Sequence, residues 1–290
     1  MLVETSLGKV NCVIAGEGTP VVLIHGFGCS HVQWMFTSTA LAQAGYMSIS
    51  IDLPGFGHSD LPLQPITTDR YADIVQEVMS KLNLPEAVLV GNSMGGFVAW
   101  LCASRMGPAV RGLVLTNTAG APQNPSLPPR NKQRRKHPLS VARIPGLAAI
   151  AGLRASNPLT RILARPLIHK SFGDPARITP EVFEALHLAA KQARIVFRNM
   201  LRFSTLQDTD SMLAKIECPT LIMWGDKDNI VPISNMDYFV DHISHAKLKV
   251  YFGVGHLPML EIPEEFNADL ISFLASVDHA QPPQVSMCIH

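Results

Sequence analysis

The sequence predicts an α/β fold: a mostly parallel, doubly wound sheet of about eight strands, with helices on both faces and an inserted helical block. Short continuous apolar runs, which are typical of strands covered on both faces, alternate with helical patterns over residues 1–119. The alternation stops near Ala119 and resumes near Pro219. Apolar residues make up 47% of the 290 residues and charged residues only 16%, so the chain can build a large core.

The first part of the chain shows the clearest alternation. Each expected strand is a short apolar run that ends at a glycine or another turn residue, and these runs cover residues 10–15, 21–24, 47–51, 88–90 and 112–116. Helices are expected over residues 31–44 and 71–82, where apolar side chains recur at helical spacing, and directly after residue 93. This regular order predicts right-handed crossovers between parallel strands.

Residues 120–213 show only helical or irregular patterns, and we predict that they form an inserted helical cap. One helix is well marked, because Thr179 can cap it and Pro180 suits its first turn. Its expected apolar stripe comprises Val182, Phe183, Leu186, Ile195, Val196, Met200 and Phe203.

Two other segments of the cap have a distinctive composition. The basic run 130–137 is interpreted as a solvated loop, with contact to an anionic surface or substrate as the alternative. Residues 144–168 are apolar but interrupted by prolines. We expect them to cover a hydrophobic pocket, and peripheral contact with a membrane surface is the alternative.

The sheet pattern returns after the cap, so the core comprises residues 1–119 and 214–277. The later strands are expected over 219–224 and 247–252, followed by a closing helix over 263–277. Residues 278–290 contain two adjacent prolines and little apolar periodicity, so we expect a frayed tail.

The turn between the predicted strand and helix near residue 93 carries the pattern G-x-S-x-G, in the form Gly91-Asn92-Ser93-Met94-Gly95. In this strand–turn–helix context the pattern is typical of a nucleophile elbow, which presents a serine hydroxyl above the sheet edge. Glycines at these spacings allow the strand and the helix to pack closely around the turn. Ser93 is therefore the candidate nucleophile.

Serine is a weak nucleophile at neutral pH and needs a base, usually a histidine that a carboxylate orients. His256 follows the last expected strand in a glycine-rich loop, which favours it over His242 and His245 on an expected helix. Asp228 follows the preceding strand and is the candidate acid. The alternative acids are Asp226, which we expect to serve the turn, and more remotely Asp208 and Asp210.

Two more loops follow expected strands. His25-Gly26-Phe27-Gly28 can direct backbone N–H groups at an anion, or it can be an ordinary strand-to-helix turn. Asp52 and His58 lie in a turn-rich loop, where we expect structural roles for their side chains.

Composition excludes several classes of function. The net charge of +1 gives no reason to expect a nucleic-acid partner, and five scattered cysteines form neither a disulfide framework nor a zinc motif. No signal peptide or transmembrane segment is expected, which favours a cytoplasmic protein. The candidate chemistry requires no cofactor and no metal.

The chain resembles the α/β-hydrolase fold superfamily along nearly its whole length. The resemblance rests on the loops 25–28, 52–59, 91–96, 225–232 and 255–256. It implies that Asp228 is the triad acid, that the amides of Phe27 and Met94 form an oxyanion hole, and that residues 120–213 are the cap inserted after the sixth strand. A serine at position 93 argues against the relatives that attack with a carboxylate, namely haloalkane dehalogenases and epoxide hydrolases.

These observations predict a serine hydrolase of small carboxylic esters with an apolar part; they leave acyl and alcohol preference and oligomeric state open. The elbow is also similar to that of hydrolases that cleave carbon–carbon bonds in ring-fission products. Those enzymes usually carry Gly-Pro-Gly after the oxyanion-loop glycine, whereas this chain has Phe27-Gly28-Cys29-Ser30, so this is the alternative. It requires an anion-binding group, for which Arg198 is a candidate. A further alternative is a ligand receptor with very slow turnover.

Overall fold

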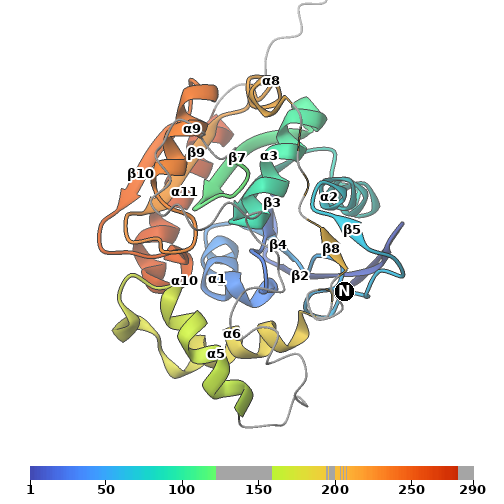
Figure 1. Cartoon of the computed structure of the whole chain (residues 1–290). Helices are drawn as coiled ribbons and strands as arrows, with labels where there is room; N and C mark the ends of the chain where they lie inside the picture. The colour runs from blue at the N-terminus through green and yellow to red at the C-terminus, as the bar shows by residue number, and fades with distance from the viewer. Residues whose placement is uncertain are drawn as a thin grey trace, which may run out of the picture.

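The computed structural model describes residues 1–121, 159–193, 195, 200–202, 204, 206 and 208–279. An eight-stranded sheet lies at its centre, in the order β1-β2-β4-β3-β6-β7-β9-β10 (Figure 1). The pairs β1–β2 and β2–β4 are antiparallel, and all other pairs in this sheet are parallel. The predicted α/β class with a mostly parallel sheet is therefore confirmed. The strands are β1 (Leu2–Thr5), β2 (Gly8–Ala15), β3 (Thr19–Ile24), β4 (Tyr46–Ile51), β6 (Ala87–Asn92), β7 (Val110–Thr116), β9 (Thr220–Gly225) and β10 (Lys247–Tyr251).

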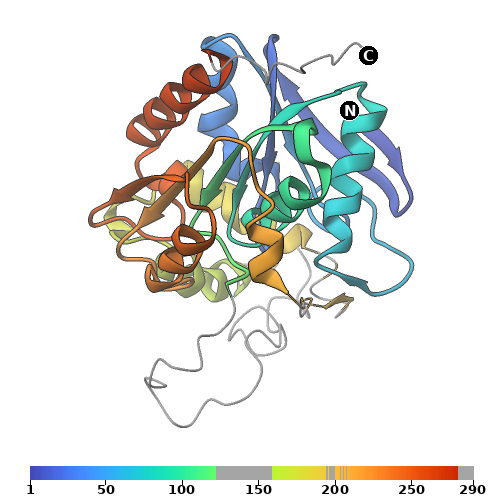
Figure 2. The same ribbon diagram turned by 90° about the horizontal axis from the view of Figure 1, so that it is seen from above.

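Helices cover both faces of the sheet. A 3-10 turn (His31–Trp34), α1 (Met35–Gln43) and α11 (Pro263–His279) cover one face, and α2 (Arg70–Lys81) and α3 (Met94–Met106) cover the other (Figure 2). Successive residues of a strand point to opposite faces. Val21 and Leu23 accordingly join the core under α1 and α11, whereas Val22 joins the core under α2 and α3.

The inserted block contributes α5 (Leu159–Lys170) and α6 (Pro180–Gln192), which contact each other and lie below α1 in Figure 1. The Thr179 hydroxyl accepts a hydrogen bond from the Val182 N–H at 3.2 Å, and Pro180 occupies the first turn of α6. Both are the signals that predicted this helix start. In addition, α6 contacts the 3-10 turn His31–Trp34.

The shorter helices complete the described structure: 3-10 turns Gly107–Ala109 and Pro175–Arg177, and α8 (Thr209–Leu213), α9 (Ser234–His242) and α10 (Pro258–Glu261). No helix within the described ranges is long and apolar enough to cross a bilayer.

The inserted block differs from the prediction in one respect. The marked helix ends at Gln192 and does not continue along the expected stripe to Phe203. Instead β8 (Leu201–Arg202) pairs in parallel with β5 (Ile66–Thr67), so the block is not exclusively helical or irregular. A helical apolar pattern cannot show that a distant segment offers backbone partners for a strand.

The two ends of the chain also differ from the prediction. Strand β1 was not predicted, and it adds an antiparallel edge to β2. Helix α11 continues to His279, and Asp278, where the frayed tail was expected to start, pairs with Arg111 at 3.2 Å. The remaining tail from residue 280, the basic run 130–137, most of the segment 144–168 and Arg198 lie outside the described residues.

Candidate active site

The candidate residues gather at one edge of the sheet, where its parallel strands end. His25 follows β3, Ser93 follows β6, Asn117 follows β7, Asp228 lies beyond β9 and His256 lies beyond β10. Parallel strands bring their carboxyl ends to the same edge, which is where open α/β sheets bind ligands. The strand order places β3, β6, β7, β9 and β10 side by side.

Ser93 is the single residue between β6 and α3, and its backbone has φ 55° and ψ −116°. A non-glycine residue in this region is strained, and such strain concentrates at functional sites. A Cβ on Gly91 would collide with the Gly95 carbonyl, and a Cβ on Gly95 with the Ile24 carbonyl. The two glycines therefore permit the close packing that holds Ser93 in this conformation.

Asp228 and His256 form a buried pair. The Nδ1 of His256 lies 2.6 Å from Oδ2 of Asp228, and their side chains are 8% and 0% exposed. The Asn117 side-chain amide also donates to Oδ2 at 2.7 Å, while the N–H groups of Ile230 and Val231 donate to Oδ1 at 2.7 and 2.9 Å. Because Nδ1 faces a carboxylate, the imidazole carries its proton there and leaves the Nε2 lone pair available to a second partner.

Asn92 connects this pair to the turn of Ser93. Its side-chain amide donates to the carbonyls of Thr116 and His256, each at 3.1 Å. The Ser93 N–H also donates to the Thr116 carbonyl at 3.1 Å. The loops that carry the predicted nucleophile, base and acid are thus joined by hydrogen bonds.

The loop after β3 lies against the Ser93 turn: a Cβ on Gly26 would stand 3.3 Å from the Ser93 Cβ. The buried His25 ring accepts from the Leu53 N–H at Nε2 (3.0 Å), so its Nδ1 carries the proton and donates to the Gly26 carbonyl at 2.7 Å. Burial lowers the pKa of His25, which favours this neutral form. Since the Gly26 carbonyl and the Phe27 N–H belong to one planar peptide, this bond fixes the direction of that N–H. Met94 follows Ser93 at the start of α3.

The rival acids and bases have other partners. Asp226 accepts from the Gly253 N–H at 2.6 Å, which is a turn role. The His242 Nδ1 lies 2.7 Å from the Tyr238 carbonyl, and the His245 Nε2 lies 2.8 Å from the Cys218 carbonyl.

Asp52 is structural, as predicted for its loop. It accepts from the N–H groups of His31 (2.6 Å) and His58 (3.0 Å) and from the Asn11 amide (2.9 Å). Burial alone would raise the pKa of Asp52, but the hydrogen bonds from His31 and His58 outweigh it and hold this pKa below its usual range.

Sequence reasoning missed one buried carboxylate beside the site. Glu261 accepts N–H groups from Gly255 (2.8 Å), Gly173 (2.9 Å) and Asp174 (2.9 Å). Gly255 precedes His256, whereas Gly173 and Asp174 belong to the inserted block. The only available signal was a charged residue within the apolar run 257–262.

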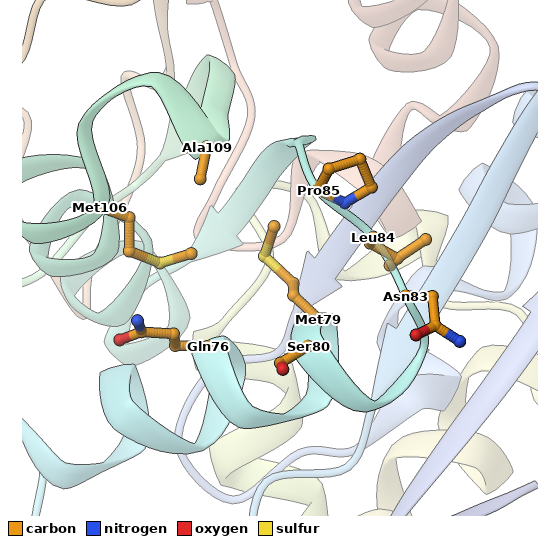
Figure 3. Close-up of a pocket in the computed structure, with 8 residues that line it drawn as sticks. All are labelled: Gln76, Met79, Ser80, Asn83, Leu84, Pro85, Met106 and Ala109. Carbon is orange, nitrogen blue, oxygen red and sulfur yellow. The ribbon is translucent and has the colours of Figure 1, made fainter.

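A surface depression lies at the opposite edge of the sheet, near the starts of β6 and β7. Figure 3 shows its lining side chains, which come from α2, the loop that follows it, the end of α3 and the 3-10 turn Gly107–Ala109: Gln76, Met79, Ser80, Asn83, Leu84, Pro85, Met106 and Ala109. Its lining contains no carboxylate, histidine or cysteine. It is therefore separate from the candidate active site. Among the described residues, no group of three or more His, Cys, Asp or Glu side chains could hold a metal ion.

The whole chain is similar to several known proteins. The chain is 28% identical to the dihydrolipoyllysine-residue acetyltransferase component of the acetoin cleaving system of Pseudomonas putida, over 90% of this chain but only 65% of the relative. The structure is similar to a meta-cleavage product hydrolase from Pseudomonas fluorescens (TM-score 0.75, 26% identity, 95% and 97% of the two chains covered). It is also similar to a thermophilic esterase from Thermogutta terrifontis (TM-score 0.73, 25% identity, 96% and 98% covered). A family model described as the alpha/beta hydrolase fold matches residues 19–263. The chain therefore belongs to the alpha/beta hydrolase fold family.

Proposed function

We propose that this chain is a serine hydrolase that cleaves carboxylic esters with an apolar part. The observation that carries the proposal is the buried His256–Asp228 pair at 2.6 Å, whose loop is bonded through Asn92 to the strained turn of Ser93. A base, its orienting acid and a presented hydroxyl are the parts that acyl transfer requires. The similarity to an esterase supports the same reaction class.

In the proposed reaction, the Ser93 hydroxyl attacks the ester carbonyl and transfers its proton to Nε2 of His256. The imidazolium, which Asp228 stabilises, returns that proton to the leaving alcohol. Water then attacks the acyl-enzyme, again giving a proton to His256, and the acid leaves as Ser93 regains its proton. The net change is one ester and one water converted to one acid and one alcohol.

The tetrahedral intermediates carry a negative oxygen, which the amides of Phe27 and Met94 would stabilise. Such donors work best when they are fixed before the reaction. The hydrogen bond from His25 to the Gly26 carbonyl supports this role for Phe27, because it orients the peptide to which the Phe27 N–H belongs.

Residues 120–213 are proposed to form the cap over this site, as an insertion between residues 1–119 and 214–277. Its described helices support this placement, because they pack with the His256 loop. Buried side chains of the two segments share one cluster: Ala164, Ile168, Phe172, Val182 and Leu186 with Val254 and Leu257.

A fluorophosphonate probe tests the proposed nucleophile directly. It should label the wild type and not Ser93→Ala, because only an activated serine hydroxyl attacks phosphorus rapidly. Hydrolysis of p-nitrophenyl esters of graded chain length should follow the same pattern and identify the preferred acyl chain. Equal labelling of both proteins would contradict the proposal.

Carbon–carbon hydrolysis of ring-fission diketones is the second candidate, and the similarity to a meta-cleavage product hydrolase favours it. The same three side chains would serve, with a carbanion as the leaving group. Faster turnover of a dienol-type diketone than of any ester would identify this activity in place of ester hydrolysis.

A further inference from the structure

Gln33 is a buried side chain that touches the loops on both sides of the candidate site. It lies in the 3-10 turn His31–Trp34 and has 0% exposure. Its Oε1 accepts from the Gly26 N–H at 2.9 Å, and its Nε2 donates to Oδ1 of Asn92 at 2.7 Å. The Sδ of Met259 lies 3.6 Å from the same nitrogen.

The orientation of both amides is determined by backbone partners. The Nδ2 of Asn92 faces the carbonyls of Thr116 and His256, so Oδ1 of Asn92 is an acceptor and requires a donor. The Gly26 N–H can only donate, so it requires an acceptor. A primary amide at position 33 supplies both, and reversing it would leave buried groups unpaired on both sides.

We propose that Gln33 is a positioning residue that keeps the oxyanion loop aligned with the Ser93 turn and the His256 loop. The proposal rests on the proposed function of Ser93, His256 and Phe27. Gly26 immediately precedes Phe27, and its backbone packs tightly on the elbow: a Cβ on Gly26 would stand 3.0 Å from Oδ1 of Asn92. Gln33 therefore acts on the residue next to the oxyanion donor.

Two substitutions separate this role from simple filling of the core. Gln33→Met keeps the length of the side chain and removes both hydrogen bonds. Gln33→Glu keeps an acceptor for the Gly26 N–H but sets a carboxylate oxygen against Oδ1 of Asn92. If Asn92 turned over to relieve this contact, the carbonyls of Thr116 and His256 would lose their donors.

The measurement is kcat per active site, with sites counted by fluorophosphonate incorporation run to completion. Loss of a direct oxyanion donor costs about 100- to 1000-fold, so we expect an indirect loss of about 10- to 100-fold in kcat for both variants, with KM changed by less than about threefold. The pH at half-maximal kcat/KM should stay at the wild-type value in Gln33→Met, because the His256–Asp228 pair is untouched. Gln43→Met and Gln43→Glu, at an exposed position of α1, are the matched controls.

A merely structural role would lower the number of titrated sites and the melting temperature while kcat per site stayed within about twofold of the wild type. That result would overturn the proposal. Gln33→Asn provides a second variant if the others fold poorly: it keeps the amide but is one methylene too short, so kcat per site should also fall. If the probe labels the wild type but not Ser93→Ala, and the Gln33 variants keep the wild-type kcat per site, only this inference is refuted. Wild-type protein that the probe does not label would refute the proposed function instead.

Discussion

Glu261→Gln is the most informative test of how the inserted block is held on the core. The Glu261 side chain is 0% exposed, and within the described part of the chain the Arg177 guanidinium pairs with it at 3.7 Å. Oε2 accepts from Gly173 and Gly255, and Oε1 accepts from Asp174, at 2.8–2.9 Å. The His256 N–H donates to the Ser171 carbonyl at 2.8 Å, which joins the same two segments a second time.

The expected magnitude follows from this geometry. Glutamine offers only one side-chain oxygen. This oxygen can keep the hydrogen bonds from the Gly173 and Gly255 N–H groups only if the glutamine NH₂ group then faces the Asp174 N–H. A buried N–H without an acceptor costs about 1–3 kcal/mol, and the retained bonds lose their charge assistance. We therefore expect the free energy of unfolding to fall by about 2–3 kcal/mol.

Urea unfolding of Glu261→Gln, followed by circular dichroism, provides the assay, with the exposed Glu264→Gln as control. The urea midpoint should fall for Glu261→Gln and stay unchanged for the control, without a change in the m-value of either. If the two variants unfold at the same midpoint, the carboxylate does not hold this junction.

Three further predictions concern buried groups. Asn117→Ala should lower kcat about tenfold, because it removes a hydrogen-bond donor from Asp228. Asn117→Asp should lower kcat further, because its carboxylate repels that of Asp228. Equal kcat values for the two variants would contradict the role of Asn117 as a donor to Asp228. Because burial lowers the pKa of His25 from its ordinary 6.5, its contribution to stability is present above pH 6.5 and is lost as pH falls below it. His25→Gln should therefore lose less stability than the wild type between pH 7 and pH 5 in urea titrations, and parallel losses would refute this. Burial raises the thiol pKa to about 12 at Cys12, Cys29 and Cys102 and to about 11 at Cys218. In the variant Cys288→Ser, a disulfide reagent at pH 8 should therefore react with these thiols only after the protein unfolds. Rapid labelling of the native variant would contradict this prediction.

The sheet and its edge could be predicted because their signals are local. An apolar run that ends in glycine identifies a strand, and it also locates the loop that follows, as for the loops of Ser93 and His256. The residues of the candidate triad lie at the predicted edge because parallel strands bring their ends together. The pairing of β5 with β8 could not be predicted, since each strand has only two residues and no pattern of its own.

The buried polar groups around the site could not be predicted for a different reason. Gln33, Asn117 and Glu261 each bond to groups that are distant in sequence: the amide of Asn92, the carboxylate of Asp228, and the N–H groups of Gly173 and Asp174. A sequence pattern does not show which distant side chains will meet, and the backbone partners carry no mark because every residue other than proline has the same N–H and C=O groups. Only the folded chain shows which polar side chains complete the loops.

The most direct test of the account is the site of covalent modification and its dependence on the base. Peptide mass mapping after fluorophosphonate treatment should locate a single phosphonyl group on Ser93, and His256→Ala should reduce the rate of its formation by at least about 1000-fold. A phosphonyl group on another residue, or an unchanged rate in His256→Ala, would contradict the proposed relay.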